Sequence, residues 1–183
     1  YTMVYGILRL INFAHGDIFT VAGFIMVYAA ASLPLSVSIP LTIVLTVLLG
    51  VMVEKVAYKP LRTAPRMSVM ISAIGMSYLL QNLALLIFGA DAKSFVAVIK
   101  VPSITLFDGE LTIKGITIVT ILACIIIMVG LSLFVKKTKP GRAMQAVSED
   151  RDAAQLMGVN VNATISLTFA IGSGLAAIAG LLL

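Results

Sequence analysis

The sequence has little of what a soluble enzyme uses. Only 11% of its 183 residues are charged, whereas a soluble domain carries about 25%. It holds a single histidine, His15, and a single cysteine, Cys124. One cysteine excludes an intrachain disulfide and a cysteine metal cluster, and one histidine argues against a zinc site. We therefore expect neither a metal nor a cofactor.

Catalytic motifs are also missing. The sequence has no phosphate-binding GxxxxGK[ST] and no Gly-x-Ser-x-Gly, so we expect no catalytic residue, no enzyme activity and no ATP binding by that route. The start has no basic stretch or cleavage site of a signal peptide. The chain begins at Tyr1 without a methionine and stops inside an apolar run at Leu183, so we expect a fragment truncated at both ends.

Apolar residues dominate what is present, at 60% of the chain. They form runs close to the 20 or so residues that a membrane-spanning helix needs. The pattern predicts an all-α, multi-span transmembrane protein with one domain over residues 1–183. The net charge of +5 is no nucleic-acid signal, because the basic residues lie in loops between the runs. The expected spans are residues 18–33, 35–53, 67–90, 116–135 and 161–183.

Lysine and arginine counts orient these spans. Residues 54–66 hold four basic residues and one acid, residues 136–160 hold five and three, and residues 91–115 hold three of each. Two spans separate the two more basic loops, so both should lie on one side of the membrane. We expect that side to be the cytoplasm, with Lys59 and Thr138 inside and Lys100 outside.

The polar segment 136–160 is the centre of our interpretation. Pro140-Gly141 predicts a turn before a short helix over residues 142–147. Asp150 favours the start of a second short helix, which Gly158 would end. Two short helices held between two spans make a docking surface for a partner, although a self-packed loop is the alternative.

Asn160 or Asn162 can then cap the last span. The residues assigned to the docking surface are Gly141, Arg142, Ala143, Ala146, Asp150, Ala153, Ala154, Leu156 and Gly158.

The loop at 91–115 predicts a small β-hairpin. Its apolar runs at 104–107 and 111–113 flank Asp108-Gly109, and Asp-Gly between two such runs is a hairpin signal. On the outer face this hairpin would either cover the helix ends or touch a soluble partner. The sequence leaves both possibilities open.

Two polar clusters interrupt the apolar sequence. The first, at residues 9–17, is either a broken helix that lines a solute path or an ordinary connection between spans. The second, Gln81-Asn82, lies within a span, where polar side chains either bond to a neighbouring helix or line a path. The candidate path residues are Asn12, His15, Asp17, Gln81 and Asn82.

Small residues recur along the last span. Gly172, Ala176 and Gly180 stand at intervals of four, a spacing that lets helix backbones approach closely. This face predicts helix packing, either inside the subunit or against a second one.

Three segments, at residues 1–17, 54–82 and 141–183, read YTMVYGILRLINFAHGD, EKVAYKPLR…ISAIGMSYLLQN and GRAMQAVSEDRDAAQLMGVNV…LTFAIGSGLAAIAGLLL. Together they resemble the permease subunit of bacterial ABC importers for branched-chain amino acids, over nearly the whole chain. The resemblance implies an inner-membrane, multi-pass permease that pairs with a second, related permease. It also implies two cytoplasmic ATPase subunits and a periplasmic solute-binding protein as partners.

In that family the segment like 141–158 contacts the ATPase, and the segment like 12–17 is a hallmark, which favours a role beyond that of a connector. Relatives that carry urea, short amides or other small solutes leave the substrate open. The family also has a longer first helix and further spans beyond Leu183, so the resemblance implies an incomplete translocation path here.

The main hypothesis is thus a transport subunit driven by a partner's ATP hydrolysis. The alternative is an autonomous channel or ion-coupled carrier, which needs charged residues deep in the membrane. The expected spans after residue 17 hold no such charge in their interiors, which favours the main hypothesis. A third possibility is a structural membrane subunit without a path. We expect the lipid bilayer and proteins as partners, and no nucleic acid.

Overall fold

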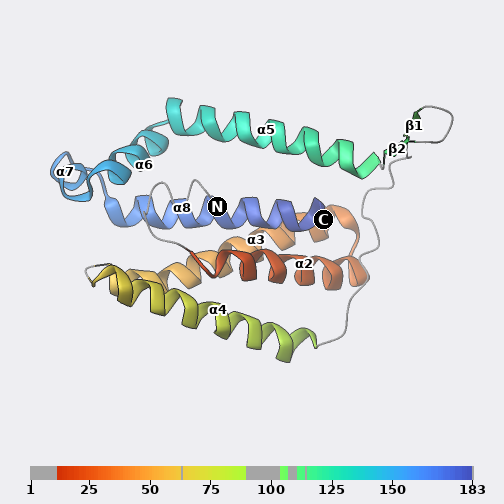
Figure 1. Ribbon diagram of the computed structural model, residues 1–183, viewed down its shortest axis with the longest axis horizontal. Helices are drawn as coiled ribbons and strands as arrows, with labels where there is room; N and C mark the ends of the chain where they lie inside the picture. Colours follow the sequence, from red (N-terminus) through yellow and green to blue (C-terminus); the bar gives the residue numbers. More distant parts are fainter. Residues whose placement is uncertain (1–11, 63, 90–103, 107–110, 114, 183) are drawn as a thin grey trace.

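The computed structural model describes residues 12–62, 64–89, 104–106, 111–113 and 115–182. In that part of the chain, five helices are long and apolar enough to cross a membrane. Two short helices join the last two of them (Figure 1). The expected all-α, multi-span fold is therefore confirmed, while residues 1–11 lie outside the described part. The helices are α2 (His15–Ser32), α3 (Leu35–Val53), α4 (Arg66–Phe88), α5 (Gly115–Lys137), α6 (Lys139–Glu149), α7 (Arg151–Leu156) and α8 (Val161–Leu182).

The segment after α3 is helical, although the sequence placed it in a loop. A π-helical turn, η1 (Glu54–Tyr58), and a 3₁₀ turn, η2 (Lys59–Leu61), continue α3. Pro60 is tolerated because it lies in the first turn of η2, where its missing N–H has no intrahelical partner to lose. The continuous helical segment Leu35–Leu61 therefore has 27 residues.

The centre of the bundle is α8, which packs on α3 and α2. Gly172, Ala176 and Gly180 are buried along it, so the structure places this small-residue face inside the subunit. A Cβ atom at Gly180 would lie 3.3 Å from the Phe19 carbonyl oxygen. Helices that approach this closely gain van der Waals contacts. These contacts matter in a membrane, because the hydrophobic effect contributes little to helix association in lipid.

A buried row of hydroxyls on α3 faces the same interior. Ser38, Thr42 and Thr46 are fully buried. Thr42 Oγ1 donates to the Ser38 carbonyl at 2.8 Å, and Thr46 Oγ1 donates to the Thr42 carbonyl at 2.7 Å. The Ser38 hydroxyl donates to the Leu33 and Pro34 carbonyls just before the helix, each at 3.2 Å. Every hydroxyl of the row is thus satisfied by nearby backbone, which is how a spanning helix carries such groups without water.

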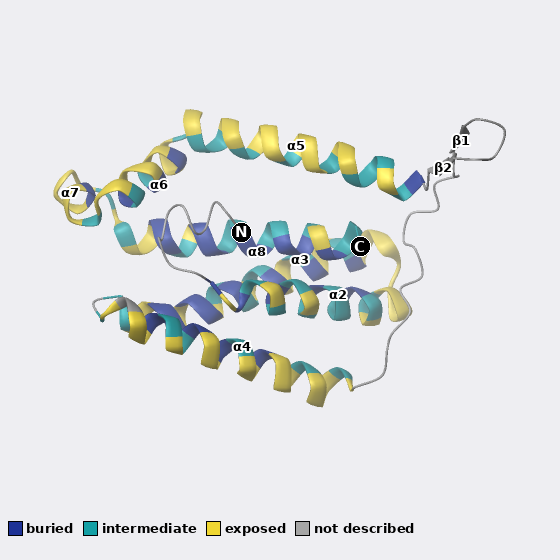
Figure 2. Ribbon diagram, viewed as in Figure 1, coloured by how far each residue is buried: buried dark blue, intermediate teal, exposed yellow. Residues whose placement is uncertain are grey.

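The helix α5 stands apart from the other spans (Figure 1). Of its residues only Gly115 is buried, and Figure 2 shows the rest of it mostly exposed. In the described structure its main contacts are with α6, the helix that follows it. The bundle proper consists of α2, α3, α4 and α8.

Strands β1 (Ile104–Leu106) and β2 (Leu111–Ile113) pair antiparallel, with Ile104 opposite Ile113. The predicted hairpin is confirmed, although Asp108-Gly109 lies outside the described residues. The hairpin lies at the end of the molecule opposite α6 and α7 (Figure 1). The described end of the 54–66 segment instead lies beside the start of α8, because Arg62 donates a hydrogen bond to Asn162. The two basic loops therefore share a side, as expected.

Candidate functional site

The helix α6 begins earlier than the sequence predicted. Thr138 caps it, with its Oγ1 accepting a hydrogen bond of 3.1 Å from the Gly141 N–H. Pro140 fits in the first turn, where no intrahelical N–H bond is lost, so the expected turn at Pro140-Gly141 is wrong. A Cβ atom at Gly141 would lie 2.4 Å from the Phe134 carbonyl oxygen. Glycine there lets α6 fold closely against the end of α5.

The segment α6–α7 has an inner and an outer side. Met144, Val147 and Ala154 are buried, and Val147 and Ala154 belong to the core cluster of the bundle. Ala154, expected on the docking surface, is only 4% exposed, so its assignment to that surface was wrong: it packs in the core. Among the other assigned residues, Gly141 is buried, Ala143 is half-buried, and the exposed ones are Arg142, Ala146, Asp150, Ala153, Leu156 and Gly158.

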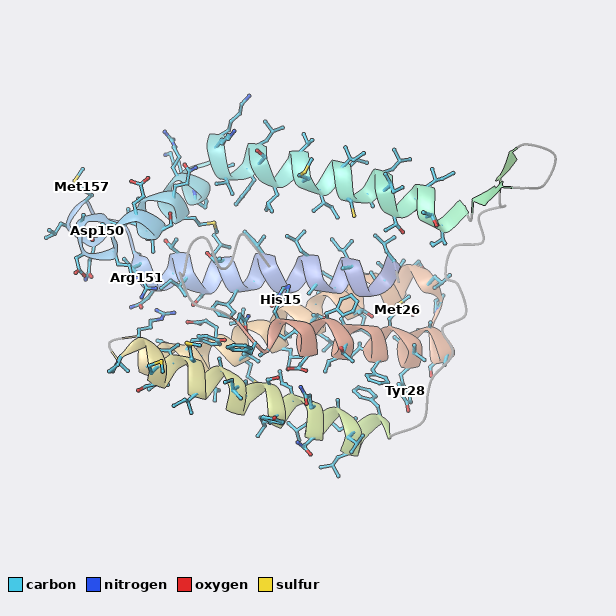
Figure 3. The ribbon with its side chains drawn as sticks, viewed as in Figure 1. His15, Met26, Tyr28, Asp150, Arg151 and Met157 are labelled. Atoms are coloured by element: carbon cyan, nitrogen blue, oxygen red, sulfur yellow. The ribbon has the colours of Figure 1, made fainter. Side chains whose placement is uncertain are left out.

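Two large apolar side chains stand at the tip of the segment. Leu156 is 89% exposed and Met157 is 85% exposed, and Figure 3 shows Met157 pointing away from the bundle. Met157 stands directly before Gly158, which ends the segment. Neighbouring exposed apolar side chains on an ordered element are typical of an interaction surface.

The caps of the short helices hold this tip in place. The Asp150 side chain accepts hydrogen bonds from the N–H groups of Asp152 at 2.9 Å and Ala153 at 3.1 Å. The predicted start of the second helix is thus confirmed. Gly158 ends the segment with φ of 83°, a conformation that costs other residues energy. Asn160 is the cap of α8, since its Oδ1 accepts from the Ala163 N–H at 3.1 Å.

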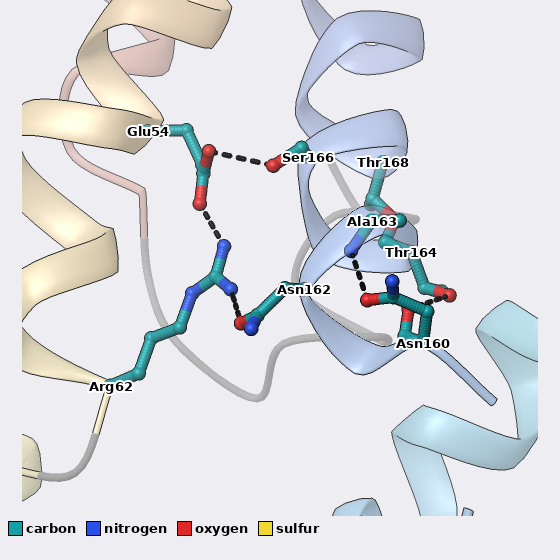
Figure 4. A network of polar contacts seen from close by, with 8 residues as sticks. All are labelled: Glu54, Arg62, Asn160, Asn162, Ala163, Thr164, Ser166 and Thr168. Carbon is teal, nitrogen blue, oxygen red and sulfur yellow. Dashed lines mark hydrogen bonds and ion pairs between the residues drawn. The ribbon is translucent and has the colours of Figure 1, made fainter. Parts of the chain in front are cut away.

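A buried polar network joins the end of α3 to α8 (Figure 4). Glu54 is fully buried, and its carboxylate accepts hydrogen bonds from Arg62 and from Ser166 Oγ, the latter at 2.9 Å. Arg62 also donates to Asn162. Sequence reasoning missed this network because it treated Glu54 as a loop residue and because Ser166 is 112 positions away.

A hollow of about 490 Å³ lies between this network and the α6–α7 segment. Arg62, Arg151, Asp152 and Gln155 contribute to its lining. In the described residues no group of three or more His, Cys, Asp or Glu side chains gathers in a way that could hold a metal ion. The hollow is lined by charged and amide side chains.

Asp17 lies inside a span and not in a connection. The helix α2 begins at His15, and the membrane-capable segment is Ala14–Ser32. The carboxylate of Asp17 accepts hydrogen bonds from Ser77 Oγ and, at 3.0 Å, from Gln81 Nε2. Ser77 is the midpoint of Arg66–Phe88, eleven residues from each end (77 − 66 and 88 − 77). Asp17 thus places a carboxylate near the middle of the bundle's depth.

This position corrects one sequence argument. The spans counted as free of charge began after residue 17, so the count left out Asp17, which lies within α2. The fully buried Glu54 likewise lies within the helical segment Leu35–Leu61. A lack of charged residues in the spans therefore cannot separate an ATP-driven subunit from an ion-coupled carrier.

The other candidate path residues have different surroundings. Asn12 is 3% exposed, and its Oδ1 accepts a hydrogen bond of 2.9 Å from Tyr58 Oη. His15 is half-buried at the start of α2 (Figure 3). Asn82 is exposed and donates to the Tyr78 carbonyl of its own helix at 2.7 Å. The fold brings Asp17 and Gln81 together and keeps Asn82 apart from them, while Arg9 lies outside the described residues.

A cleft of about 160 Å³ opens beside Asp17 and Gln81, between α2 and α4. Its lining is polar at this pair and mostly apolar elsewhere. The lining residues are Asp17, Thr20, Val21, Phe24, Leu80, Gln81, Ala84, Leu85 and Gly89.

Comparisons with known proteins assign the family. The family model described as branched-chain amino acid transport system, permease component, matches residues 1–183. The high-affinity branched-chain amino acid transport system permease protein BraD of Pseudomonas aeruginosa is 38% identical over 198 residues, covering 100% of this chain and 64% of the relative. The LivH permease proteins of Salmonella typhimurium and Escherichia coli are each 36% identical, covering 100% of this chain and 63% of the relative.

The chain spans a little under two thirds of the length of these relatives. No solved structure is a significant match. The matching proteins are transport permeases rather than enzymes, and the five membrane-capable helices agree with a multi-pass membrane protein. The chain therefore belongs to the family of permease components of branched-chain amino acid transport systems.

Proposed function

We propose that this chain is part of the membrane-spanning permease subunit of an ATP-driven ABC importer in a bacterial inner membrane. Its solute is a branched-chain amino acid, with urea, short amides or other small polar solutes as the wider class. It pairs with a second, related permease, contacts two cytoplasmic ATPase subunits and receives solute from a periplasmic binding protein. Membership of the family supports this assignment.

The observation that carries the proposal is the form of the α6–α7 segment. Its inner side is buried in the bundle, and its tip exposes Leu156 and Met157 almost completely. A surface that is ordered, fixed to the spans and apolar at its tip is what force transfer from another subunit needs. The two side chains enter a groove of the ATPase as an amphipathic helix enters a partner.

The hollow beside α7 supports the same role. Arg62 contributes to its lining and also bonds to Glu54 and Asn162. A partner side chain seated there contacts both α7 and the network that links α3 to α8. A displacement of the ATPase therefore reaches α7 and, through the network, α3 and α8 of the bundle.

The test uses the full-length permease, expressed with its ATPase subunits and purified through a tag on the permease. We expect Leu156→Asp with Met157→Asp to remove the ATPase from the complex and to abolish solute uptake, with permease abundance unchanged. A central apolar anchor contributes about 2 kcal/mol or more, which is roughly thirtyfold in affinity.

The control is Leu156→Met with Met157→Leu, which keeps both side chains apolar and should retain the ATPase. Ala154→Arg is unsuitable as the test, since Ala154 is buried and a charge there would disrupt the fold. ATPase that co-purifies at wild-type levels with the double aspartate variant would exclude this segment as the coupling surface.

A further inference from the structure

The cleft between α2 and α4 has a charged end and an apolar end. Asp17 and Gln81 meet at one end, and α2 and α4 run in the same direction away from them (Figure 1). Phe24, seven residues beyond Asp17, lies about 10 Å further along α2. It stacks on Phe88 with ring centroids 5.0 Å apart. The cleft thus combines a carboxylate with an apolar wall that a neighbouring ring holds in place.

The Asp17 carboxylate has two neutral donors and no cation. Ser77 and Gln81 donate to it, and in the described part of the chain it has no lysine or arginine partner, the ion pair there being Glu54–Arg62. A carboxylate has about four acceptor sites, so it retains capacity toward the cleft. A charge held at this depth without a counter-charge is costly and marks a functional site.

The lining indicates which cation fits. Hard metal ions such as Ca²⁺ take about six to eight oxygen ligands, whereas here Asp17 and Gln81 adjoin Val21, Leu80 and other apolar side chains. An ammonium group needs only a few acceptors, and an apolar group bonded close to it would fill the rest of the cleft. A single molecule that carries an ammonium group next to an apolar group would therefore fit both ends of the cleft.

We propose that the cleft binds the ammonium group of an α-amino acid at Asp17 and its branched apolar side chain against Phe24, Leu80 and Leu85. Gln81 positions the Asp17 carboxylate, because its Nε2 donates both to Asp17 Oδ1 and to Ser77 Oγ. This inference rests on the proposed transport function and adds the residues that contact the solute. It also gives the lone carboxylate of α2 a role in selecting amino acids over uncharged solutes.

The first test removes the charge. The full-length importer, with its ATPase, second permease and binding protein, is reconstituted in proteoliposomes, and radiolabelled leucine uptake is driven by ATP. We expect Asp17→Asn to lower uptake at least tenfold while subunit assembly stays at the wild-type level. Uptake within twofold of wild type would overturn the proposal.

The second test changes the apolar end and does not depend on Asp17. Ala84→Leu fills the part of the cleft that would hold the solute side chain, so we expect the ratio of leucine to alanine uptake to fall at least fivefold with the same binding protein. The control is Ala30→Leu, which adds the same side chain at an exposed position of α2 outside the cleft. An unchanged ratio in Ala84→Leu would exclude the cleft as the solute site.

These outcomes separate the two proposals. Wild-type uptake that is lost in the Leu156→Asp, Met157→Asp variant supports the transport function whatever the cleft variants do. If Asp17→Asn fails to assemble, the leucine to alanine ratio of Ala84→Leu decides. If the wild-type importer takes up no amino acid at all, both proposals fall.

Discussion

Ser166 on α8 donates a 2.9 Å hydrogen bond to the carboxylate of Glu54, across 112 positions of the chain. Glu54 is fully buried, and Arg62 ion-pairs with the same carboxylate. Arg62 Nε is itself buried without a hydrogen-bond partner in the described structure. Replacing either Glu54 or Arg62 alone would therefore leave the other charge buried without its partner.

Removing one partner of the pair should destabilise the protein strongly. We expect Arg62→Met to lower the free energy of unfolding by about 3–5 kcal/mol, since an uncompensated charge would stay buried. The variant Glu54→Leu, Arg62→Met should recover at least half of that loss. Denaturant unfolding of the purified full-length protein in detergent measures both. A double variant as unstable as the single one would contradict this account.

The contact between Gly50 and Ser173 fixes the spacing of α3 and α8. A Cβ atom at Gly50 would lie 1.7 Å from Ser173 Oγ and 2.5 Å from Ser173 Cβ. We expect Gly50→Ala to cost about 1–3 kcal/mol of stability through overpacking, and Ser173→Gly to restore it in the double variant. Gly130→Ala, at a site with open space, is the control. Thermal melts compare the four proteins, and a harmless Gly50→Ala would refute the close fit.

The Asp150 cap should hold α7 in place. Asp150→Ala removes the acceptor for the N–H groups of Asp152 and Ala153, so we expect a loss of about 1 kcal/mol in local stability. Asp150→Asn keeps an acceptor oxygen and should lose much less. Hydrogen exchange of these two amides reports the effect. If exchange were accelerated equally in both variants, the charge of Asp150 would matter and its acceptor oxygen would not.

The two basic loops should be reached from the cytoplasm only. Lys59 and Gln155 are exposed at the same end of the bundle, and the hairpin lies at the other end (Figure 1). In a Cys124→Ala background, we expect an impermeant thiol reagent to label Lys100→Cys in intact cells and to leave Lys59→Cys and Gln155→Cys unlabelled. Labelling of either of these two would reverse the orientation.

The spans could be predicted because length and apolarity alone determine them. Their ends were harder, and α2 shows why: its N-cap is Ala14, which makes no side-chain cap bond. No capping residue marked its start, so the expected span began only at Ile18, and the sequence left open whether Asp17 belongs to a broken helix or to a connection. The start of α7, which Asp150 does cap, was predicted correctly.

The sequence also could not predict which single residues of a short helix are buried and which are exposed. The helix α7 has six residues, fewer than two turns, so periodicity cannot separate the buried Ala154 from the exposed Ala153. The Glu54–Arg62 pair depends on η1 and η2, whose π and 3₁₀ geometry brings together residues eight apart. A sequence read at the α-helical period of 3.6 gives no reason to pair them.

The close fit of Gly141 against Phe134 and Val135 makes the junction of α5 and α6 an elbow. Backbone contact sets the angle between the two helices, and apart from α6 little of the described structure holds α5 in place. With 23 residues, α5 is a lever arm about 34 Å long, and a rotation of about 5° at the elbow would sweep its far end through about 3 Å. A small rotation of α6 would thereby be amplified into a larger displacement at the far end of α5.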